Sequence, residues 1–320
     1  MTGTGSNVCA GIDAGSECSK LAYSDNLGSR VIARAEGADF VSLREDAEIF
    51  FDDIVSSCVV AVKDNTPSRQ RESLRVRALN SGFRNADVMG QFEAMTFGVN
   101  NDEARTLICD FGASGCVFAV IEAGDVVDEG YVDVGGNMFD KIFAEYLSEL
   151  KLRKKADDFI LKEAKRIKHI LSDNEARLWN NSTIYRNDLE RLIYFPVLRA
   201  SHTLKRFLRV WKPQRFILTG GCAKIPLVRE IFKGAEVDYD IIARGASLKG
   251  LMLSKQEARK NIIDNVSRIR ALRAEIIGIE EKLTRQQKDR IYVLFRQAEG
   301  INDAGIIALM ENLVREIKNA

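Results

Sequence analysis

Two short stretches of the chain share one alternation of apolar runs and small residues. Each passes from an apolar segment through an aspartate and a turn of small residues into a second apolar segment, in Leu107–Glu122 and in Val8–Tyr23. This pattern predicts two β-hairpins whose turns let backbone N–H groups approach an anion closely. One such hairpin is equally typical of a plain structural turn. The repetition favours two phosphate-holding hairpins that face one another across a cleft.

The rest of the chain up to residue 253 alternates between strand-like and helix-like segments. Strands are expected at Arg30–Ala35, Cys58–Val62, Ala86–Met89, Asp125–Asp133, Ser182–Tyr185 and Arg215–Thr219. Helices are expected at Ser68–Gly82, Phe92–Phe97, Phe139–Leu150, Ala156–Ser172, Asn187–Trp211 and Ile225–Phe232. The small-residue segment Ala243–Leu253 is expected to pack closely on a nucleotide or on another helix. This order of strands and helices predicts an α/β fold.

The pattern changes at Ser254, after which glycine and proline are almost absent. Apolar residues then recur at spacings of three and four, which predicts a long amphipathic helix with a coiled-coil-like seam. They are Ile262, Val266, Ile269, Leu272, Ile276, Ile279 and Leu283. Thr284 and Gln287 have the spacing of a capping box for a second helix, which Gly300 is expected to end. We expect a helical hairpin or small bundle over residues 254–320 that contacts a protein partner or self-associates.

The composition of the chain indicates how large a hydrophobic core it can form and how its charge is distributed. The 320 residues are 46% hydrophobic and 29% charged, which suits a globular protein of two compact domains. The net charge is only +1, but residues 1–150 hold 12 Lys and Arg against 25 Asp and Glu, whereas residues 151–215 hold 17 against 7. The cations of the second segment alternate with apolar residues at helical spacing. They therefore favour a solvated helix face over a nucleic-acid surface.

The cysteines and the N-terminal residues point to a cytoplasmic protein. The six cysteines form no C-x-x-C pair, and four of them lie in or beside apolar runs, so buried reduced thiols are expected. They are Cys9, Cys18, Cys58, Cys109, Cys116 and Cys222. The first residues, MTGTGSN, lack the basic and apolar regions of a signal peptide, and no apolar run is long enough to span a bilayer. We expect no membrane partner.

Five sequence blocks of moderate specificity occur in an order that is typical of one family. They are GIDAGSECSKLAY, VVAVKDNTPSRQRESLRVRALNSGF, LICDFGASGCVFAVI, VGGNMFDKIF, and ILTGGCAKIPLVREIF with ARGASLKGLML. Over about residues 8–253 the chain thus resembles the ATPase domain of the seventy-kilodalton heat-shock (DnaK-like) chaperones, in the actin, sugar-kinase and chaperone ATPase superfamily. The resemblance implies a two-lobed actin-like ATPase fold of duplicated ribonuclease-H-like domains, with reduced peripheral subdomains and an all-α C-terminal extension. It implies ATP or ADP bound with Mg²⁺ between the lobes.

The resemblance also assigns residue ranges and roles. Residues 1–115 and 116–253 together form the expected nucleotide-binding domain, with lobe I at about 8–133 and lobe II at about 134–253. Asp13 and Asp110 are expected to hold the hydrated Mg²⁺ from opposite sides and to orient an attacking water, because phosphoryl transfer needs charge neutralisation and positioning. Residues expected around the phosphates, ribose and base are Gly15, Ser16, Gly112, Ala113, Ser114, Gly115, Gly135, Gly136, Lys168, Ser172, Gly220, Gly221 and Lys224.

Several positions depart from the family pattern. The small subdomain that carries the family's phosphate-contacting lysine is largely absent, and no lysine is assigned that role. The first hairpin has Glu17 where the family has a threonine, and Val117 stands where an aspartate is expected. The family's catalytic glutamate has no clear counterpart, with Gln91 and Glu93 as the nearest candidates. In the base-binding helix, Lys165 replaces the usual glutamate.

Lys20 is a candidate for compensating the missing lysine. Asp13, Gly15, Ser16 and Lys20 have the spacing D-x-G-S-x-x-x-K, which resembles the first phosphate loop of actin and of several kinases in the superfamily. There the lysine contacts the phosphates. The alternative is a strand lysine that points to solvent, and the sequence leaves both open.

Four functions remain open from the sequence. The first is a compact, chaperone-like protein that binds Mg·ATP, hydrolyses it slowly and uses nucleotide state to alter the contacts of its helical tail. The others are a degenerate pseudo-ATPase scaffold or adaptor, an actin-like filament protein, and a small-molecule kinase. No strand alternation follows Ser254, so the family's peptide-binding domain is not expected.

Overall fold

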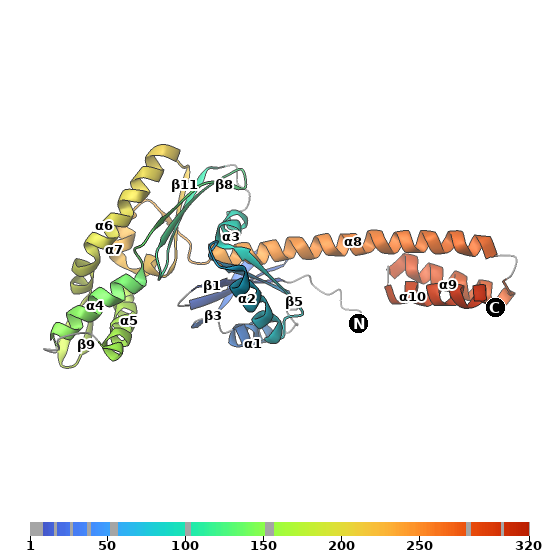
Figure 1. The fold of residues 1–320 in the computed structure, drawn as a ribbon, viewed down its shortest axis with the longest axis horizontal. Helices are drawn as coiled ribbons and strands as arrows, with labels where there is room; N and C mark the ends of the chain where they lie inside the picture. Colours follow the sequence, from blue (N-terminus) through green and yellow to red (C-terminus); the bar gives the residue numbers. More distant parts are fainter. Residues whose placement is uncertain are drawn as a thin grey trace. The chain divides into compact units, whose positions relative to one another are not determined.

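The protein is an α/β protein that divides into two compact units, Met1–Leu251 and Met252–Ala320. The computed structural model describes residues 9–15, 18–25, 28–36, 40–51, 57–99, 104–150, 157–279, 283–301 and 304–319. Two five-stranded mixed sheets lie in the first unit, whereas the described residues of the second are helical (Figure 1). The predicted α/β class is confirmed.

The first sheet, together with the helices packed on its outer face, forms what we call lobe I. Its strands, in the order β3-β2-β1-β4-β5, are β1 (Cys9–Ala14), β2 (Cys18–Asp25), β3 (Gly28–Glu36), β4 (Ser57–Val62) and β5 (Asn85–Gly90). β1 is antiparallel to β2 and parallel to β4. Helices α1 (Phe40–Phe51) and α2 (Ser68–Asn80) cover one face, where Phe40 and Ala78 pack with Ile12 and Val60.

The second sheet repeats the arrangement of the first, and with its insertions it forms lobe II. Its order is β12-β11-β6-β7-β8, from β6 (Thr106–Phe111), β7 (Cys116–Glu122), β8 (Asp125–Val132), β11 (Arg215–Thr219) and β12 (Glu236–Val237). As in lobe I, the first strand pairs antiparallel with the next and parallel with the strand that follows the insertion. The lobe boundary expected near residue 133 is therefore wrong: it lies between β5 and β6, because β6 pairs with β11 rather than with lobe I.

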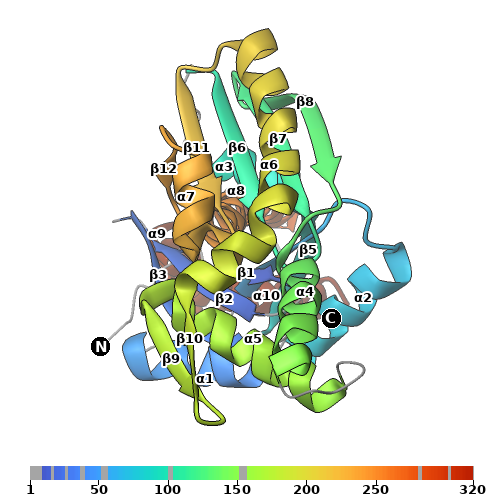
Figure 2. The same ribbon diagram turned by 90° about the vertical axis from the view of Figure 1, so that its left-hand side faces the viewer.

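A long insertion between β8 and β11 thickens lobe II. It contains α4 (Gly136–Leu150), α5 (Asp158–Asp173), β9 (Ala176–Trp179), β10 (Ser182–Tyr185) and α6 (Arg186–Trp211). After β11 come the 3₁₀ turn η1 (Gly221–Lys224) and α7 (Pro226–Ile231). Figure 2 shows α6 along the face of the second sheet. The corresponding connection in lobe I contains only α1 among its described residues.

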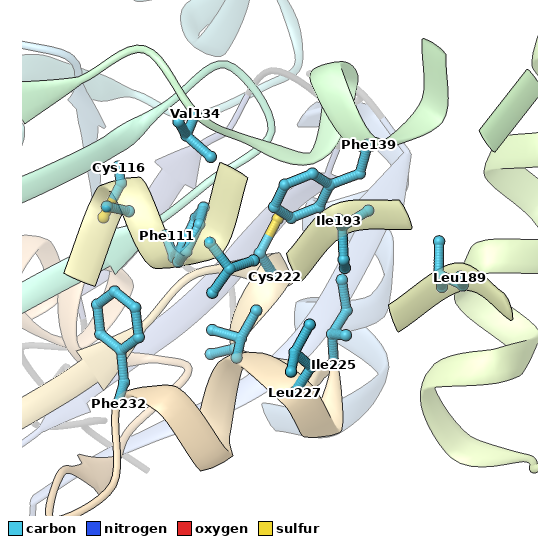
Figure 3. Packing of buried hydrophobic residues seen from close by; sticks show 14 of the residues in the cluster. Phe111, Cys116, Val134, Phe139, Leu189, Ile193, Cys222, Ile225, Leu227 and Phe232 are labelled. Atoms are coloured by element: carbon cyan, nitrogen blue, oxygen red, sulfur yellow. The ribbon is translucent and has the colours of Figure 1, made fainter. Parts of the chain in front are cut away.

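The core of lobe II forms between this insertion and the sheet (Figure 3). The ring centroid of Phe111, from β6, lies 5.8 Å from that of Phe139 in α4 and 5.7 Å from that of Phe232. Successive side chains of a strand point to opposite faces. Burying Phe111 in this core therefore directs the preceding residue, Asp110, to the other face of β6.

Two helices join the lobes, α3 (Gln91–Gly98) and the first turns of α8 (Ile241–Ile279) (Figure 1). Their apolar residues share one core with both sheets, which includes Cys9 of β1 and Ile108 of β6. The contact is close because small residues meet: a Cβ on Gly11 would lie 2.8 Å from the Cα of Ser247, and one on Gly245 would lie 2.8 Å from the carbonyl carbon of Ala94. The small-residue segment therefore packs on a helix and a strand, and not on the cleft.

The second unit contains the rest of α8, α9 (Arg285–Ile301) and α10 (Ala304–Asn319). Ile269 and Leu272 are buried against Ile307, Met310 and Val314. The capping box forms as predicted, with the Thr284 hydroxyl oxygen accepting from the Gln287 N–H at 3.3 Å and the Gln287 side chain accepting in return. Helix α9 ends at Ile301, just beyond the predicted Gly300.

Only the later part of the predicted seam is covered. Ile262 and Val266 are exposed, whereas Ile269, Leu272 and Leu283 are buried. No helix in the described ranges combines the length and apolar character needed to cross a membrane.

Among the described residues the cysteines behave as expected. Those with described side chains are buried free thiols: Cys9, Cys58, Cys109, Cys116 and Cys222. The side chain of Cys18 lies outside the described residues.

Candidate functional site

A cleft of about 770 Å³ lies between lobe I and lobe II in the first unit. This volume is in the range of small-molecule sites. Its walls are built where β1, β4, β6 and β11 end, which is where open α/β sheets bind ligands. The predicted residues that line it are Asp13, Gly15, Lys20, Asp110, Gly112, Ala113, Ser114, Gly115, Gly136, Lys168, Ser172, Gly220, Gly221 and Lys224.

Asp13 and Asp110 occupy equivalent places in the two lobes. Each is the fifth residue of a six-residue first strand, and each enters the same cleft. In β1, Asp13 shares a face with Gly11, which packs on α8; in β6, Asp110 shares a face with Ile108 of the joint core. Each carboxylate thus lies where its strand reaches the cleft, on the strand face that packs on the core shared by the two lobes.

Both carboxylates are held in an environment that disfavours their charge. Burial raises the pKa of Asp13, and Lys20, whose Nζ lies 3.7 Å from the Asp13 Oδ2, opposes that rise. Burial and then repulsion from Asp13 raise the pKa of Asp110 to about 6, partly offset by Lys20, Gln91 and Lys63. Because the two charges repel each other, a cation between them would relieve that repulsion.

Lys20 points into the cleft. It lies opposite Asp13 in the β1–β2 ladder, its side chain is 13% exposed, and its ammonium donates to the backbone carbonyl of Tyr239 just before α8. The alternative of a lysine that points to solvent is therefore wrong. Contact of Lys20 with a phosphate remains a prediction.

A second lysine, Lys63, reaches the turn Gly112–Gly115, although no sequence motif singled it out. It directly follows β4, and its ammonium donates to the Ser114 hydroxyl of lobe II. The available signal was its place as the first residue after a buried parallel strand, since ligands gather at the carboxyl ends of such strands. Lys63 and Lys20 both come from lobe I.

Of the two candidates for the missing glutamate, Gln91 lies in the cleft. Its amide donates to the Asp110 Oδ2, and its side chain is buried. Glu93 instead forms an ion pair with Lys249 at 3.0 Å. Asp64 fixes this start of α3, because its Oδ2 accepts from the Phe92 N–H at 3.0 Å.

The second hairpin turn is supported from behind by the start of α4. The Gly112 N–H donates to the Gly115 carbonyl at 3.0 Å, which closes the turn. The Gly136 N–H donates to the Gly112 carbonyl at 3.1 Å. A Cβ on Gly135 would lie 2.5 Å from the Gly115 nitrogen, so Gly135 is required by packing on the turn. Gly135 was expected near the ribose and phosphates, but it does not line the cleft.

Lys168 and Ser172 are part of the lobe II wall on α5. The Lys168 ammonium forms a 2.7 Å ion pair with the Asp140 Oδ1 and also donates to the Gly136 carbonyl at 3.3 Å. Both side chains of this pair are less than 10% exposed. The Ser172 hydroxyl donates to the Lys168 carbonyl at 3.0 Å. The predicted base-binding lysine thus already has a buried counter-charge.

Gly220 and Gly221 line the cleft after β11, and they make a matched pair for mutation. Gly220 has φ of +88°, and a Cβ there would overlap the Asp110 Oδ1 and lie 2.6 Å from the Phe111 carbonyl carbon. A Cβ on Gly221 meets nothing within 4 Å. Only Gly220 therefore needs to be glycine.

We expect Gly220→Ala to lower the free energy of unfolding by about 1 to 3 kcal/mol, because it combines a strained φ with displacement of Asp110. Urea unfolding followed by circular dichroism measures it. Gly221→Ala is the control and is expected to change that free energy by less than about 0.5 kcal/mol. Equal effects of the two substitutions would contradict the close packing of β11 on Asp110.

Ser16, and Glu17 with its added negative charge, lie outside the described residues. Within the described part of the chain, no group of three or more His, Cys, Asp or Glu side chains is arranged to hold a metal ion. A cation in this cleft would therefore be shared between Asp13, Asp110, water and the ligand itself.

Comparison with known proteins adds no further assignment, since no family model matches the chain and a search of curated proteins finds no match.

Proposed function

We propose that this protein binds ATP and ADP with Mg²⁺ in the cleft between lobe I and lobe II, and hydrolyses ATP slowly or not at all. The main support is the repeated topology: two sheets of the same strand order each bring an aspartate, Asp13 or Asp110, to one cleft. The proposed fold is a two-lobed actin-like ATPase fold of duplicated ribonuclease-H-like domains. It is similar to the ATPase domain of DnaK-like chaperones.

In this proposal the phosphates lie at the end of the cleft that holds the two aspartates. Lys20 and Lys63 offer ammonium groups to the phosphate oxygens. The turn Gly112–Gly115 brings backbone close to the same place. Mg²⁺ supplies charge neutralisation there when it is bound with the nucleotide. Asp13 and Asp110 fit such an ion because both line one cleft, where a cation would offset the repulsion between their carboxylates.

Isothermal titration with ATP and with ADP, each with and without MgCl₂, tests this function. We expect both nucleotides to bind, and Mg²⁺ to tighten binding. Asp13→Asn should remove the effect of Mg²⁺, whereas Asp125→Asn, an exposed residue at the start of β8, should not. The proposal fails if neither nucleotide binds at millimolar concentration.

Slow or absent hydrolysis is proposed because the side chain beside Asp110 is an amide. Gln91 can orient water but cannot accept its proton, which general-base catalysis requires. We expect Gln91→Glu to raise the rate of ATP hydrolysis by about tenfold or more, measured as phosphate release. Glu93→Gln is the control, since Glu93 pairs with Lys249 outside the cleft. An unchanged rate in Gln91→Glu would show that the amide is not what limits hydrolysis.

The helical tail over residues 254–320 is proposed to contact a protein partner or a second copy, and the protein is proposed to act in the cytoplasm. The exposed Ile262, Ile263 and Val266 on α8 support a contact there. Sedimentation velocity with and without ATP detects self-association, and an unchanged monomer would leave a different protein as the partner.

A further inference from the structure

The turn Gly112–Gly115 has each of its four backbone carbonyl groups held by a donor of the protein. Three of the carbonyls accept from backbone N–H groups: Gly112 from Gly136 at 3.1 Å, Ala113 from Asn137 at 2.8 Å, and Gly115 from Gly112 at 3.0 Å. The fourth, that of Ser114, accepts from a side chain, because the Tyr131 hydroxyl on β8 donates to it at 3.0 Å. The turn therefore keeps its carbonyl oxygens paired within lobe II.

The N–H groups of the same turn are arranged in the opposite way. In the part of the chain that the structure describes, those of Ala113, Ser114 and Gly115 have no acceptor, although all three residues line the cleft. Successive N–H groups of this kind form a site for an anion. A carbonyl oxygen turned to the same place would repel that anion. The turn thus suits a phosphate group only while its carbonyls stay held.

The Ser114 carbonyl is the one whose position depends on a replaceable side chain. The peptide that contains it ends in Gly115, and glycine adopts φ values that other residues rarely reach. This peptide can therefore rotate more readily than a peptide between two larger residues. A rotation that breaks the hydrogen bond from Tyr131 would turn the carbonyl oxygen toward the cleft and the Gly115 N–H away from it.

The β7–β8 ladder places Tyr131 over the turn, since Tyr131 lies opposite Val117 in that ladder. Its side chain is 58% exposed, so it adds little to the core of lobe II. A Cβ on Gly115 would lie 2.6 Å from its hydroxyl oxygen, which shows how closely the side chain approaches the turn. Partial burial and then the negative charge of Asp133 raise the pKa of Tyr131, so the hydroxyl keeps its proton at pH 7 and can donate it.

We propose that Tyr131 is a positioning residue of the phosphate site: its hydroxyl holds the Ser114 carbonyl away from the cleft, which leaves the N–H groups of the turn available to a phosphate. This inference rests on the proposed function and adds a residue to its site. Tyr131 does not itself line the cleft, so it acts through the turn and not by touching the ligand. Its hydroxyl oxygen also lies 3.3 Å from the Asp133 Oδ1, so Asp133 and the Ser114 carbonyl compete for a single hydrogen.

Titration calorimetry with ADP and MgCl₂ tests the proposal on Tyr131→Phe, which removes the hydroxyl and keeps the ring. We expect the variant to bind ADP about three- to tenfold more weakly than the wild type, which is the range for one lost hydrogen bond. Asp133→Ala leaves the hydroxyl hydrogen to the Ser114 carbonyl alone, so it should bind ADP as tightly as the wild type. Tyr292→Phe on α9 makes the same change at a side chain of similar exposure, 61%, and should also have no effect.

Proton–nitrogen NMR of protein labelled with nitrogen-15 glycine gives a second readout, which a general loss of stability would not move. Tyr131→Phe should shift the amide resonance of Gly115 in the ligand-free protein and leave that of Gly234, which follows α7, in place. ADP should move the Gly115 resonance in the wild type and move it less in the variant.

Equal affinities of the wild type and Tyr131→Phe for ADP overturn this inference and leave the proposed function standing. The same loss of affinity in Asp133→Ala also overturns it, because Tyr131 would then act through Asp133. If the wild type binds no ADP, the proposed function fails. An unshifted Gly115 resonance in Tyr131→Phe would show separately that the hydroxyl does not hold the turn.

Discussion

Asp110→Asn is expected to raise the melting temperature of the ligand-free protein at pH 8 and to abolish the dependence of nucleotide binding on Mg²⁺. Burial and then Asp13 raise the pKa of Asp110 to about 6, above its ordinary value of 3.8. A carboxyl group with a raised pKa stabilises the fold fully below its unfolded value and loses that contribution as pH rises through the folded one. At pH 8 the ionised Asp110 therefore opposes folding.

The size of the effect follows from this shift. The rise of this pKa from 3.8 to about 6 corresponds to a loss of on the order of 3 kcal/mol in the free energy of unfolding when Asp110 is ionised. Asparagine carries no charge, and its side-chain oxygen can still accept from Gln91, so we expect Asp110→Asn to regain part of this free energy. We expect a gain of about 1 to 2 kcal/mol at pH 8, which is about 2 to 6 °C in melting temperature for a unit of this size. Differential scanning calorimetry from pH 4 to 8 should show the gain disappear as pH falls, because wild-type Asp110 becomes neutral.

Asp13→Asn serves as the matched comparison. Burial also raises the pKa of Asp13, but its carboxylate faces Lys20, so asparagine removes a favourable ion pair together with the unfavourable charge. Its gain in melting temperature should be smaller. A lower melting temperature of Asp110→Asn at pH 8 would contradict the electrostatic strain that we infer between the two carboxylates.

The binding result for Asp110→Asn should oppose the stability result. If the cleft binds Mg·ATP as proposed, loss of one of its two carboxylates is expected to weaken Mg·ATP binding by about 100-fold and metal-free binding much less, as measured by titration calorimetry. A fold that is more stable and a site that is weaker would together show that the charge of Asp110 is retained for ligand binding, at the expense of stability. Unchanged Mg·ATP affinity would exclude a role for Asp110 in holding the ion.

Lys168→Met is expected to lower the free energy of unfolding by about 3 to 5 kcal/mol, the cost of leaving one member of a buried ion pair without its partner. The Lys168 and Asp140 side chains are 8% and 7% exposed, and their charged atoms are 2.7 Å apart. Burial already raises the pKa of Asp140, and only Lys168 opposes that rise. Without Lys168, an ionised Asp140 should destabilise the fold, and protonation of Asp140 should relieve this.

A second substitution distinguishes lost pairing from lost packing. Asp140→Asn added to Lys168→Met should recover a large part of the stability, because the unpaired charge is removed. Urea unfolding at pH 7 measures the free energy of unfolding of the wild type and of each variant in this double-mutant cycle. Lys162→Met, an exposed position on the same helix, is the control and should change stability by less than about 0.5 kcal/mol. A Lys168→Met variant as stable as the wild type would show that the pair contributes nothing.

Gln91 and Lys63 each follow a strand that the sequence predicts, and both line the cleft. The sequence located the strand before each residue, and the strand before Lys63 is a buried, continuous apolar run. Whether a side chain just beyond a strand enters a cleft depends on the segment that packs opposite it. For Gln91 that segment is β6 with Asp110, and for Lys63 it is the turn with Ser114. No local pattern distinguished Gln91 from Glu93.

The sequence by itself determined the local elements of this protein: two aspartate-ended hairpins, the alternating strands and helices of residues 9–251, and the capped helices of the tail. These depend on periods of two and 3.6 residues and on capping and turn chemistry, which act within a few residues. Only the tertiary structure decided that β6 pairs with β11 and so belongs to lobe II, that Lys20 turns to Tyr239, and that Lys168 is paired with Asp140. The physical reason is that burial and charge pairing are settled by residues brought together from distant parts of the chain, as when Thr106 meets Arg215 in one sheet.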